Sequence, residues 1–414
     1  MRAENAARVI VVGAGPAGSA TAWWLARAGI DTLVLDRARF PRPKPCSEYL
    51  SPQASRILDE MGVLETIERS GAAQLAGMDV RAPSGTTIRG RFAADHGWRP
   101  HRDRGLALPR TTLDPILIDA ARGAGARVEE RSRVLDLVRD ASGRVAGVRV
   151  AGERGAGGER TLGAELVIGA DGLRSVVARR LGVARQARWP RRVALVAHYE
   201  GVAGVGDVGE MHVDADGYVG LASVGNGLVN VAVVVPAGTR ALAGGPVACF
   251  EQFLAARPQL APRFAGARRA TPVRATGPFA ASSRRAWADG AALVGDAADF
   301  FDPFTGEGIF AALRGAELLA PYAVEAIAAR SPHAHRTALA AYDRARRHTF
   351  GGKWKVERLI GLAVGFPPLF ERAARVLSRR KDMADLLVGV TGDFVPPREV
   401  LRPSYLARLF LASA

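Results

Sequence analysis

Near its start the chain shows a short apolar run, a glycine-rich turn and a longer apolar segment. Residues 8–12 are rich in β-branched side chains, while the alanine, tryptophan and leucine of residues 19–28 suit a buried helix. A second apolar run over 31–35 ends in Asp36. Short apolar runs bounded by turns are typical of strands buried in a parallel sheet. The pattern therefore predicts a strand–helix–strand unit.

The turn between the first strand and the helix has the spacing of a dinucleotide-binding loop. Gly13 permits the tight turn, Gly15 lets the backbone approach a pyrophosphate, and Gly18 allows close packing of the helix. The helix N-terminus offers unpaired N–H groups to an anion. Asp36 follows at the distance expected of an acid that bonds a ribose. These features predict a site for an ADP-containing cofactor.

Three later segments repeat the pattern of an apolar strand that ends in a turn before a helix. They are residues 106–117 with Arg110 at the junction, 166–173 ending near Asp171, and 291–319 with Gly295 and Asp296 at the turn. Strand ends scattered in this way are expected of a dinucleotide domain whose segments are not contiguous.

Other segments have a different pattern. Residues 193–235 contain four alternating runs, the last two separated by Gly225-Asn226-Gly227, which predicts an antiparallel sheet with a tight hairpin. From about residue 332 the pattern is helical, with breaks at Pro367-Pro368 and Pro396-Pro397. An inserted sheet and a C-terminal helical region are therefore expected.

The composition adds limits rather than a function. The 414 residues are 48% hydrophobic and 24% charged, which excludes a disordered or multi-spanning chain. The net charge of +16 is nearly all arginine, spread along the chain with alanine and glycine, which favours a codon-usage bias over a nucleic-acid partner. Cys46 and Cys249 match no disulfide or metal pattern, so a cytoplasmic protein without a metal is expected. Cys249, in an apolar run, is expected in the core.

One C-terminal segment leaves two interpretations open. Over residues 369–383 apolar positions recur at helical spacing, and arginines fall largely elsewhere. Such a helix either covers a substrate cavity or makes a peripheral contact with the inner face of a membrane. Together with the apolar stretch 361–370, it suggests a lipophilic substrate.

Four sequence features together resemble the flavoproteins that have a single dinucleotide domain, which include aromatic hydroxylases (group A flavin monooxygenases), flavin halogenases and geranylgeranyl reductases. The features are GAGPAG at 13–18, Arg110, ADGLRS at 170–175 and GDAA to GEG at 295–308. The resemblance covers about residues 8–320. It implies an α/β fold with a glutathione-reductase-type FAD-binding Rossmann domain, an inserted antiparallel β-sheet substrate domain and a helical C-terminal region.

The resemblance also implies how FAD is held. The glycine motif and Asp36 would hold the ADP half, Arg110 would lie along the pyrophosphate, and Asp296 would bond the ribityl chain. The helix that begins near Gly306 would direct its N-terminus at the flavin, where reduction places negative charge. With a single dinucleotide fingerprint, NAD(P)H is expected as a transient electron donor. The expected cofactor-binding residues are Gly13, Gly15, Pro16, Ala17, Gly18, Asp36, Arg37, Arg110, Asp171, Gly295, Asp296, Pro303, Gly306, Gly308 and Ile309.

Within this group, residues 43–52 and 302–313 look most like the geranylgeranyl reductase branch. The chain departs from that branch because Ser47 and Glu48 follow Cys46 in place of glycine, and because only Tyr218 remains of an aromatic-rich segment. The Cys46 thiol either helps to deliver a proton beside the flavin or simply packs, and both interpretations stay open. The catalytic candidates are Cys46, Glu48 and Tyr218, and further cavity candidates are Tyr49 and His198.

These patterns predict a division of the chain into six segments. FAD-binding parts are expected at residues 1–75, 101–182 and 281–330, substrate-domain parts at 76–100 and 183–280, and the helical region at 331–414.

Three functions are compatible with the residues. The first is an NAD(P)H-using FAD monooxygenase that oxidises a hydrophobic aromatic or polyketide-like molecule of secondary metabolism. The second is a geranylgeranyl-reductase-like enzyme that reduces isoprenoid double bonds. A prenyl-lipid carrier without catalysis is the third, and the complete FAD motifs argue against it.

Overall fold

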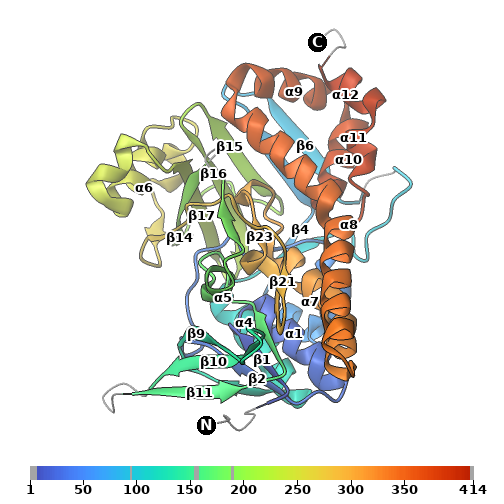
Figure 1. Ribbon diagram of the computed structural model, residues 1–414. Helices are drawn as coiled ribbons and strands as arrows, with labels where there is room; N and C mark the ends of the chain where they lie inside the picture. Colours follow the sequence, from blue (N-terminus) through green and yellow to red (C-terminus); the bar gives the residue numbers. More distant parts are fainter. Residues whose placement is uncertain (1–6, 94–95, 153–157, 188–190, 411–414) are drawn as a thin grey trace.

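The structure is a computed structural model, which describes residues 7–93, 96–152, 158–187 and 191–410 (Figure 1). Its elements form two large sheets with a cavity between them and a group of C-terminal helices along one side (Figure 1).

The predicted strand–helix–strand unit lies at the centre of a six-stranded sheet of order β21-β22-β12-β1-β2-β8. β1 (Val9–Val12) pairs in parallel with β2 (Thr32–Leu35) and β12 (Leu166–Gly169), and these three strands are fully buried. The outer strands are β8 (Arg127–Glu129), β22 (Ala291–Leu293) and the antiparallel β21 (Trp287–Ala288). The helices α1 (Pro16–Arg27), α4 (Arg110–Gly123) and α7 (Gly308–Ala328) accompany this sheet, with α1 packed against both others. The strands expected near residues 8–12, 31–35, 166–173 and 291–293 are confirmed.

The second sheet has eight strands in the order β18-β14-β17-β16-β15-β5-β6, with β19 beside β14. The four strands predicted over 193–235 are confirmed as β14 (Arg192–Glu200), β15 (Gly209–Asp214), β16 (Gly217–Gly225) and β17 (Leu228–Pro236). Gly225, Asn226 and Gly227 all have positive φ, of 86°, 51° and 74°, as the hairpin between β16 and β17 requires. The other members are β5 (Gly77–Arg81), β6 (Thr87–Arg91), β18 (Arg268–Arg269) and β19 (Arg274–Thr276).

Smaller sheets and helices connect the two layers. The three-stranded sheets are β3 (Tyr49–Leu50), β7 (Gly105–Ala107) and β4 (Ala73–Leu75); β11 (Glu159–Gly163), β10 (Val145–Ala151) and β9 (Val134–Arg139); and β13 (Ala184–Gln186), β20 (Ala281–Ser283) and β23 (Asp299–Phe300). The short helices are α2 (Ala54–Glu60), α3 (Leu64–Arg69), α5 (Val176–Arg180) and α6 (Gly245–Ala255). Cys249 of α6 is fully buried, as expected.

The C-terminal region is helical, as predicted. Its helices are α8 (Pro332–Gly365), α9 (Pro367–Arg379), α10 (Lys381–Thr391), α11 (Arg398–Leu401) and α12 (Pro403–Phe410). The expectation of one continuous helix over 369–383 is wrong, because Arg380 leaves the helical conformation and separates α9 from α10. The apolar face of α9, including Phe370 and Leu377, is buried in the same cluster as Met211 and Tyr218 of the second sheet. This face is therefore covered by the protein itself.

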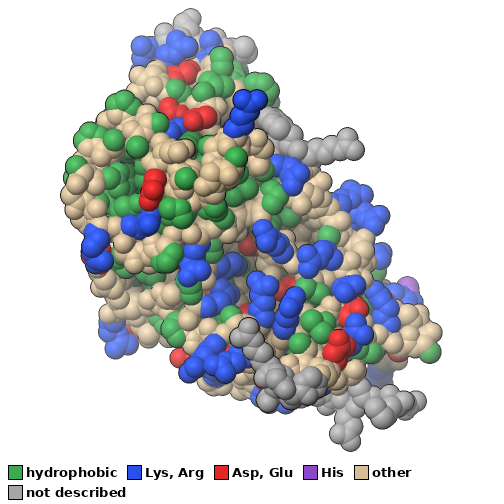
Figure 2. All heavy atoms as spheres, turned by 90° about the vertical axis from the view of Figure 1, so that its left-hand side faces the viewer, with side chains coloured by type: hydrophobic (Ala, Val, Ile, Leu, Met, Phe, Trp, Pro, Cys, Tyr) green, Lys and Arg blue, Asp and Glu red, His purple; other side chains and the backbone are tan. Residues whose placement is uncertain are grey.

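Within the described ranges, none of the helices is both long and apolar enough to cross a bilayer. Figure 2 shows arginine and lysine side chains spread from one end of the displayed face to the other. That distribution agrees with a charge excess that runs along the whole chain.

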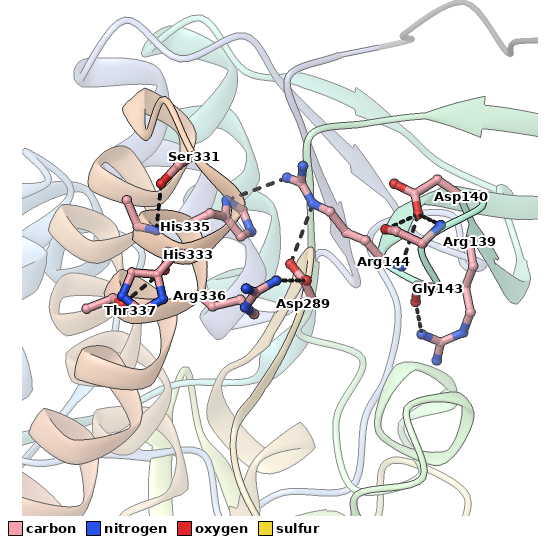
Figure 3. A network of polar contacts seen from close by, with 12 residues as sticks. Arg139, Asp140, Gly143, Arg144, Asp289, Ser331, His333, His335, Arg336 and Thr337 are labelled. Carbon is pink, nitrogen blue, oxygen red and sulfur yellow. Dashed lines mark hydrogen bonds and ion pairs between the residues drawn. The ribbon is translucent and has the colours of Figure 1, made fainter.

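A polar network attaches the start of α8 to the first layer (Figure 3). Ser331 caps α8 by accepting a hydrogen bond from the backbone N–H of Ala334 at 3.1 Å. On the next turn, Arg336 donates to Asp289 at 3.0 Å, and the guanidinium of Arg144 lies 3.5 Å from His335. These residues come from α8, the β21–β22 turn and the β9–β10 hairpin, so the network fixes the direction in which α8 leaves this layer.

Candidate functional site

A large cavity lies between the two sheets, with a volume of about 1470 Å³ including its open mouth. One side is formed by the N-termini of α1 and α7 and by residues 43–48, here called the cysteine loop. The opposite side is formed by β14, β15, β16 and β17, and α8 contributes Trp354 and Glu357. Of the predicted residues, those that line the cavity are Gly15, Pro16, Ala17, Cys46, Arg110, Tyr218, Asp296, Pro303, Gly306, Gly308 and Ile309.

The glycine loop before α1 has the geometry that a bound pyrophosphate requires. A Cβ atom on Gly13 would lie 2.5 Å from the carbonyl oxygen of Ala170, and one on Gly18 would lie 1.7 Å from that of Gly13. Both positions are thus closed by backbone. A Cβ atom on Gly15 would meet only two guanidinium groups, at 3.6 and 3.7 Å, on the cavity side. The N-terminus of α1 therefore faces an open and positively charged space.

The positive charge beside Gly15 comes from Arg110, Arg42 and Lys44. Asp114 holds Arg110 through two hydrogen bonds of 2.6 and 2.9 Å and lies 3.5 Å from Arg42. Burial lowers the pKa of Lys44, and the neighbouring Arg110 lowers it further. Such a concentration of buried cations is unfavourable by itself and is relieved by an anion. The charge and the open backbone together fit a pyrophosphate.

The N-terminus of α7 reaches the same cavity from the other side. Gly306 has a φ of +73°, which a β-carbon would strain, and Gly308 begins the helix at the cavity wall. Asp296 lies beside it and is half-buried, and desolvation raises its pKa while Lys44 and Arg110 lower it. A helix N-terminus in this position stabilises negative charge on a bound ring.

The cysteine loop is held rigidly from behind. Glu48 has a φ of 61° and a carboxylate that accepts hydrogen bonds from Arg110 N at 2.8 Å and Asn230 Nδ2 at 2.9 Å. Its Oε2 also lies 2.6 Å from Nε2 of His198. Asn230 donates in addition to the carbonyl oxygen of Cys46 at 2.9 Å. Glu48 and His198 therefore lie behind the cavity wall, where they position the loop. Cys46 lines the cavity, and its Sγ accepts a hydrogen bond from the N–H of Glu48 at 3.3 Å.

Tyr218 contributes a fixed polar group to the opposite wall. Its hydroxyl donates to Asp302 at 2.9 Å, and Arg192 donates to the same carboxylate at 2.5 Å. Burial and the adjacent Asp302 raise the pKa of Tyr218 well above its ordinary value, so the hydroxyl keeps its proton. Tyr49, by contrast, lines a smaller neighbouring pocket instead of the large cavity.

The sequence of the chain decides its family and the cofactor of that family. The FAD-binding domain family matches residues 6–354. The chain belongs to this family. The protein is therefore an FAD-dependent oxidoreductase of the monooxygenase and reductase type, as the sequence predicted, and NAD(P)H is the electron donor typical of such proteins.

Two curated relatives are reductases. The chain is 30% identical to a menaquinone reductase of Mycobacterium tuberculosis over 424 aligned positions, which cover 95% of this chain and 93% of the relative. It is 33% identical over 329 positions to a digeranylgeranylglycerophospholipid reductase of Methanopyrus kandleri, which cover 77% of this chain and 80% of the relative.

Solved structures with the same fold are more distant in sequence. A geranylgeranyl bacteriochlorophyll reductase-like protein from Thermoplasma acidophilum has a TM-score of 0.73 and 23% identity, covering 98% of this chain and 96% of its own. A myxobacterial chondrochloren halogenase has a TM-score of 0.77 and 24% identity, covering 86% and 82%. These similarities confirm the fold class.

Some of the predicted cofactor-binding residues do not line the cavity. Asp36 accepts hydrogen bonds of 2.8 Å from the backbone N–H groups of Ala14 and Ala38, beside the glycine loop. Asp171 instead caps α5, because its carboxylate accepts from Ser175 and from the N–H of Val176, both at 2.5 Å. Of the remaining predicted residues, Arg37 is exposed to solvent. Gly295 packs against Ala17.

Several residues at the site were not predicted. Arg42 and Lys44 had a detectable signal, because they alternate with prolines directly before Cys46. Glu357 had none, since it lies in a helix without a motif and only the fold brings it to the cavity wall.

Proposed function

We propose that this protein reduces a carbon–carbon double bond in the isoprenoid chain of a lipid. The observation that carries the proposal is the cysteine loop, which places the Cys46 thiol on the wall of an FAD cavity in a chain at least 30% identical to two reductases. Menaquinone and digeranylgeranylglycerophospholipid, the compounds in those names, both carry polyisoprenoid chains. The sequence alone placed a monooxygenase first and this reduction second.

The walls of the cavity support an apolar substrate. The side formed by the second sheet presents Ala194, Val196, Met211, Ala232 and Val234 to the cavity. Pockets of this kind bind apolar molecules by burying their surface, while a few polar groups set the orientation. Tyr218 and Asp302 are such groups on this side, and their mutual hydrogen bond keeps them fixed.

Different residues would bind the cofactor, position the substrate and exclude water in such a reaction. The glycine loop, Arg110, Arg42 and Lys44 would hold the pyrophosphate of FAD, and the N-terminus of α7 would face its ring. When bound and reduced, FAD supplies a hydride. Cys46 would hold the double bond in register with it, and the hydrogen bond from Asn230 to the Cys46 carbonyl keeps the thiol in place. The apolar walls exclude water from the reacting carbons.

Replacing Cys46 with alanine is expected to lower product formation by about 100-fold, because small misplacements of reacting groups have effects of this size. FAD binding should stay within about twofold, since the pyrophosphate contacts are unchanged. Both quantities follow from FAD titration and product mass spectrometry. Cys249→Ala, the same change in the core of the second sheet, is the matched control and should retain wild-type turnover. Unchanged turnover in Cys46→Ala would contradict the role of the thiol.

A monooxygenase remains a second candidate, and one feature of the cavity favours it. Ala194, Gly220 and Ala232 have very short side chains, so this wall leaves room for a ring system as well as for a chain. Water exclusion by the same wall would protect a reactive oxygen species.

Isotope labelling separates the two candidates. The protein is incubated with FAD, NAD(P)H, labelled oxygen gas and an extract containing menaquinones and other isoprenoid lipids, with phenolic compounds in a parallel reaction. We expect a lipid product that is heavier by two hydrogen atoms and carries no label. A product with one labelled oxygen atom and no saturated lipid would overturn the reductase proposal.

A further inference from the structure

The cavity wall contains three carboxyl groups beyond the cofactor end, and one of them differs from the others. Asp299 is paired with Arg346, and Asp302 is paired with Arg192. Both carboxylates are thus paired with buried guanidinium groups. Glu357 also lines the cavity, yet its carboxyl makes no hydrogen bond or ion pair with any residue that the structure describes.

We propose that Glu357 is the proton donor to the substrate, a catalytic role that rests on the proposed double-bond reduction. Glu357 and Trp354, three positions apart on α8, reach the cavity together, as residues at this helical spacing share a face. Trp354 contacts Phe301 edge-to-face at 6.0 Å, and both rings line the cavity with Glu357. An acid on this wall lies within reach of a hydrocarbon chain bound in the cavity.

The charged groups that face Glu357 favour a proton on it near neutral pH. Burial raises the pKa of Glu357 to about 7, Lys353 opposes that rise, and the carboxylates of Asp302 and Asp299 add to it. Arg358, the next residue on α8, lowers the pKa slightly, and its guanidinium lies 4.6 Å from the ring of Phe301. A general acid transfers its proton best when its pKa is close to the working pH.

Lys353 connects Glu357 with the cofactor end of the cavity. It lies one turn earlier on α8, and its ammonium contacts Glu307 at 2.5 Å and also Asp393. Glu307 directly precedes Gly308 at the N-terminus of α7 and lines the cavity itself. Because burial lowers the pKa of Lys353 to about 7, this group can exchange a proton in the same pH range. Lys353 is therefore a positioning residue that sets the protonation of Glu357.

The step balances without a further reactant. One alkene carbon gains a hydride from the reduced cofactor, for which NAD(P)H is the reductant. The π electron pair of the double bond takes the Glu357 proton at the other carbon, which leaves a carboxylate. That carboxylate then recovers a proton from water, and the double bond has gained two hydrogens.

The test compares Glu357→Gln with Glu325→Gln, a matched change on the exposed side of α7. In the cofactor-free protein, infrared spectra recorded across pH should show a protonated carboxyl band that disappears as pH rises through about 7. We expect this titrating band in wild type and Glu325→Gln and its loss in Glu357→Gln. A band that persists in Glu357→Gln would overturn the assignment, whatever the reaction of the loaded enzyme.

Half-reaction kinetics provide the second readout. In Glu357→Gln, FAD affinity and its reduction by NAD(P)H should match wild type, while transfer to the lipid should fall by about 100-fold. In wild type, transfer should fall as pH rises through about 7, because the acid loses its proton. Equal transfer rates in wild type and Glu357→Gln would overturn this inference alone. Labelled oxygen in the wild-type product would instead overturn the proposed function and with it the substrate of Glu357.

Discussion

Gly15→Ala is expected to weaken FAD binding by about 100-fold, equivalent to about 2.8 kcal/mol, while the stability of the cofactor-free protein stays nearly unchanged. The added methyl group would clash with no backbone atom, because its nearest neighbours are the guanidinium groups of Arg110 and Arg42 at 3.6 and 3.7 Å. It would occupy the space through which the backbone N–H groups of α1 approach the pyrophosphate. Charge-assisted hydrogen bonds of that kind contribute about 1.5–3 kcal/mol each. FAD fluorescence titration and thermal unfolding measure the two quantities.

Gly18→Ala tests whether a substitution in this loop lowers the stability of the cofactor-free protein in addition to its affinity for FAD. A β-carbon there would lie 1.7 Å from the carbonyl oxygen of Gly13, so the strand and helix must move apart. The expected result is a loss of at least about 3 kcal/mol of stability even without FAD. Gly123→Ala, at a glycine of α4 with open space around it, should leave FAD affinity unchanged. Strong FAD binding by Gly15→Ala would contradict the placement of the pyrophosphate.

Arg110→Met is expected to remove FAD binding and also to destabilise the cofactor-free protein by about 3–5 kcal/mol. The Asp114 side chain is fully buried and would lose both of its hydrogen bonds from Arg110, of 2.6 and 2.9 Å. A buried carboxylate without its partner is costly, and Arg42 at 3.5 Å replaces that partner only in part. Urea unfolding of the cofactor-free variant measures the destabilisation.

The double variant Arg110→Met with Asp114→Leu distinguishes the two roles of the arginine. Exchange of a buried ion pair for apolar residues is often neutral, so most of the lost stability should return. FAD affinity should not return, because the guanidinium that faces Gly15 is still missing. If the double variant bound FAD like wild type, Arg110 would have only a structural role.

Much of the fold could be predicted because its signals are local. The β-branched run of β1, the glycine spacing that follows it and the alternation in β14 to β17 each reflect the conformation of a few consecutive residues. The glycine motif was predictable because its spacing can be read from consecutive residues, although the atoms that close Gly13 belong to the distant Ala170 and Asp171. A family motif then extended the prediction to Arg110 and to the N-terminus of α7.

The failures have a common cause, which is that a periodic pattern does not say what an element packs against. The apolar positions of 369–383 correctly indicated a buried helical face, yet α9 and α10 both pack on β6 and must turn at Arg380 to do so. Glu48 was a reasonable candidate acid by sequence. Its left-handed backbone and its bonds to Asn230 and Arg110 turn the carboxylate away from the cavity.

The sequence by itself determined the class of fold, the cofactor and the loop that carries Cys46, because local spacing and family motifs indicate each of them. Only the tertiary structure decided which acids line the cavity. Glu48, Asp302 and Glu357 lie in separate parts of the chain, and their surroundings come from other elements: Asn230 and His198 pair with the first, Arg192 pairs with the second, and burial near Asp302 and Asp299 raises the pKa of the third. Burial and pairing set the protonation of a carboxyl group, and both arise only when distant segments pack together.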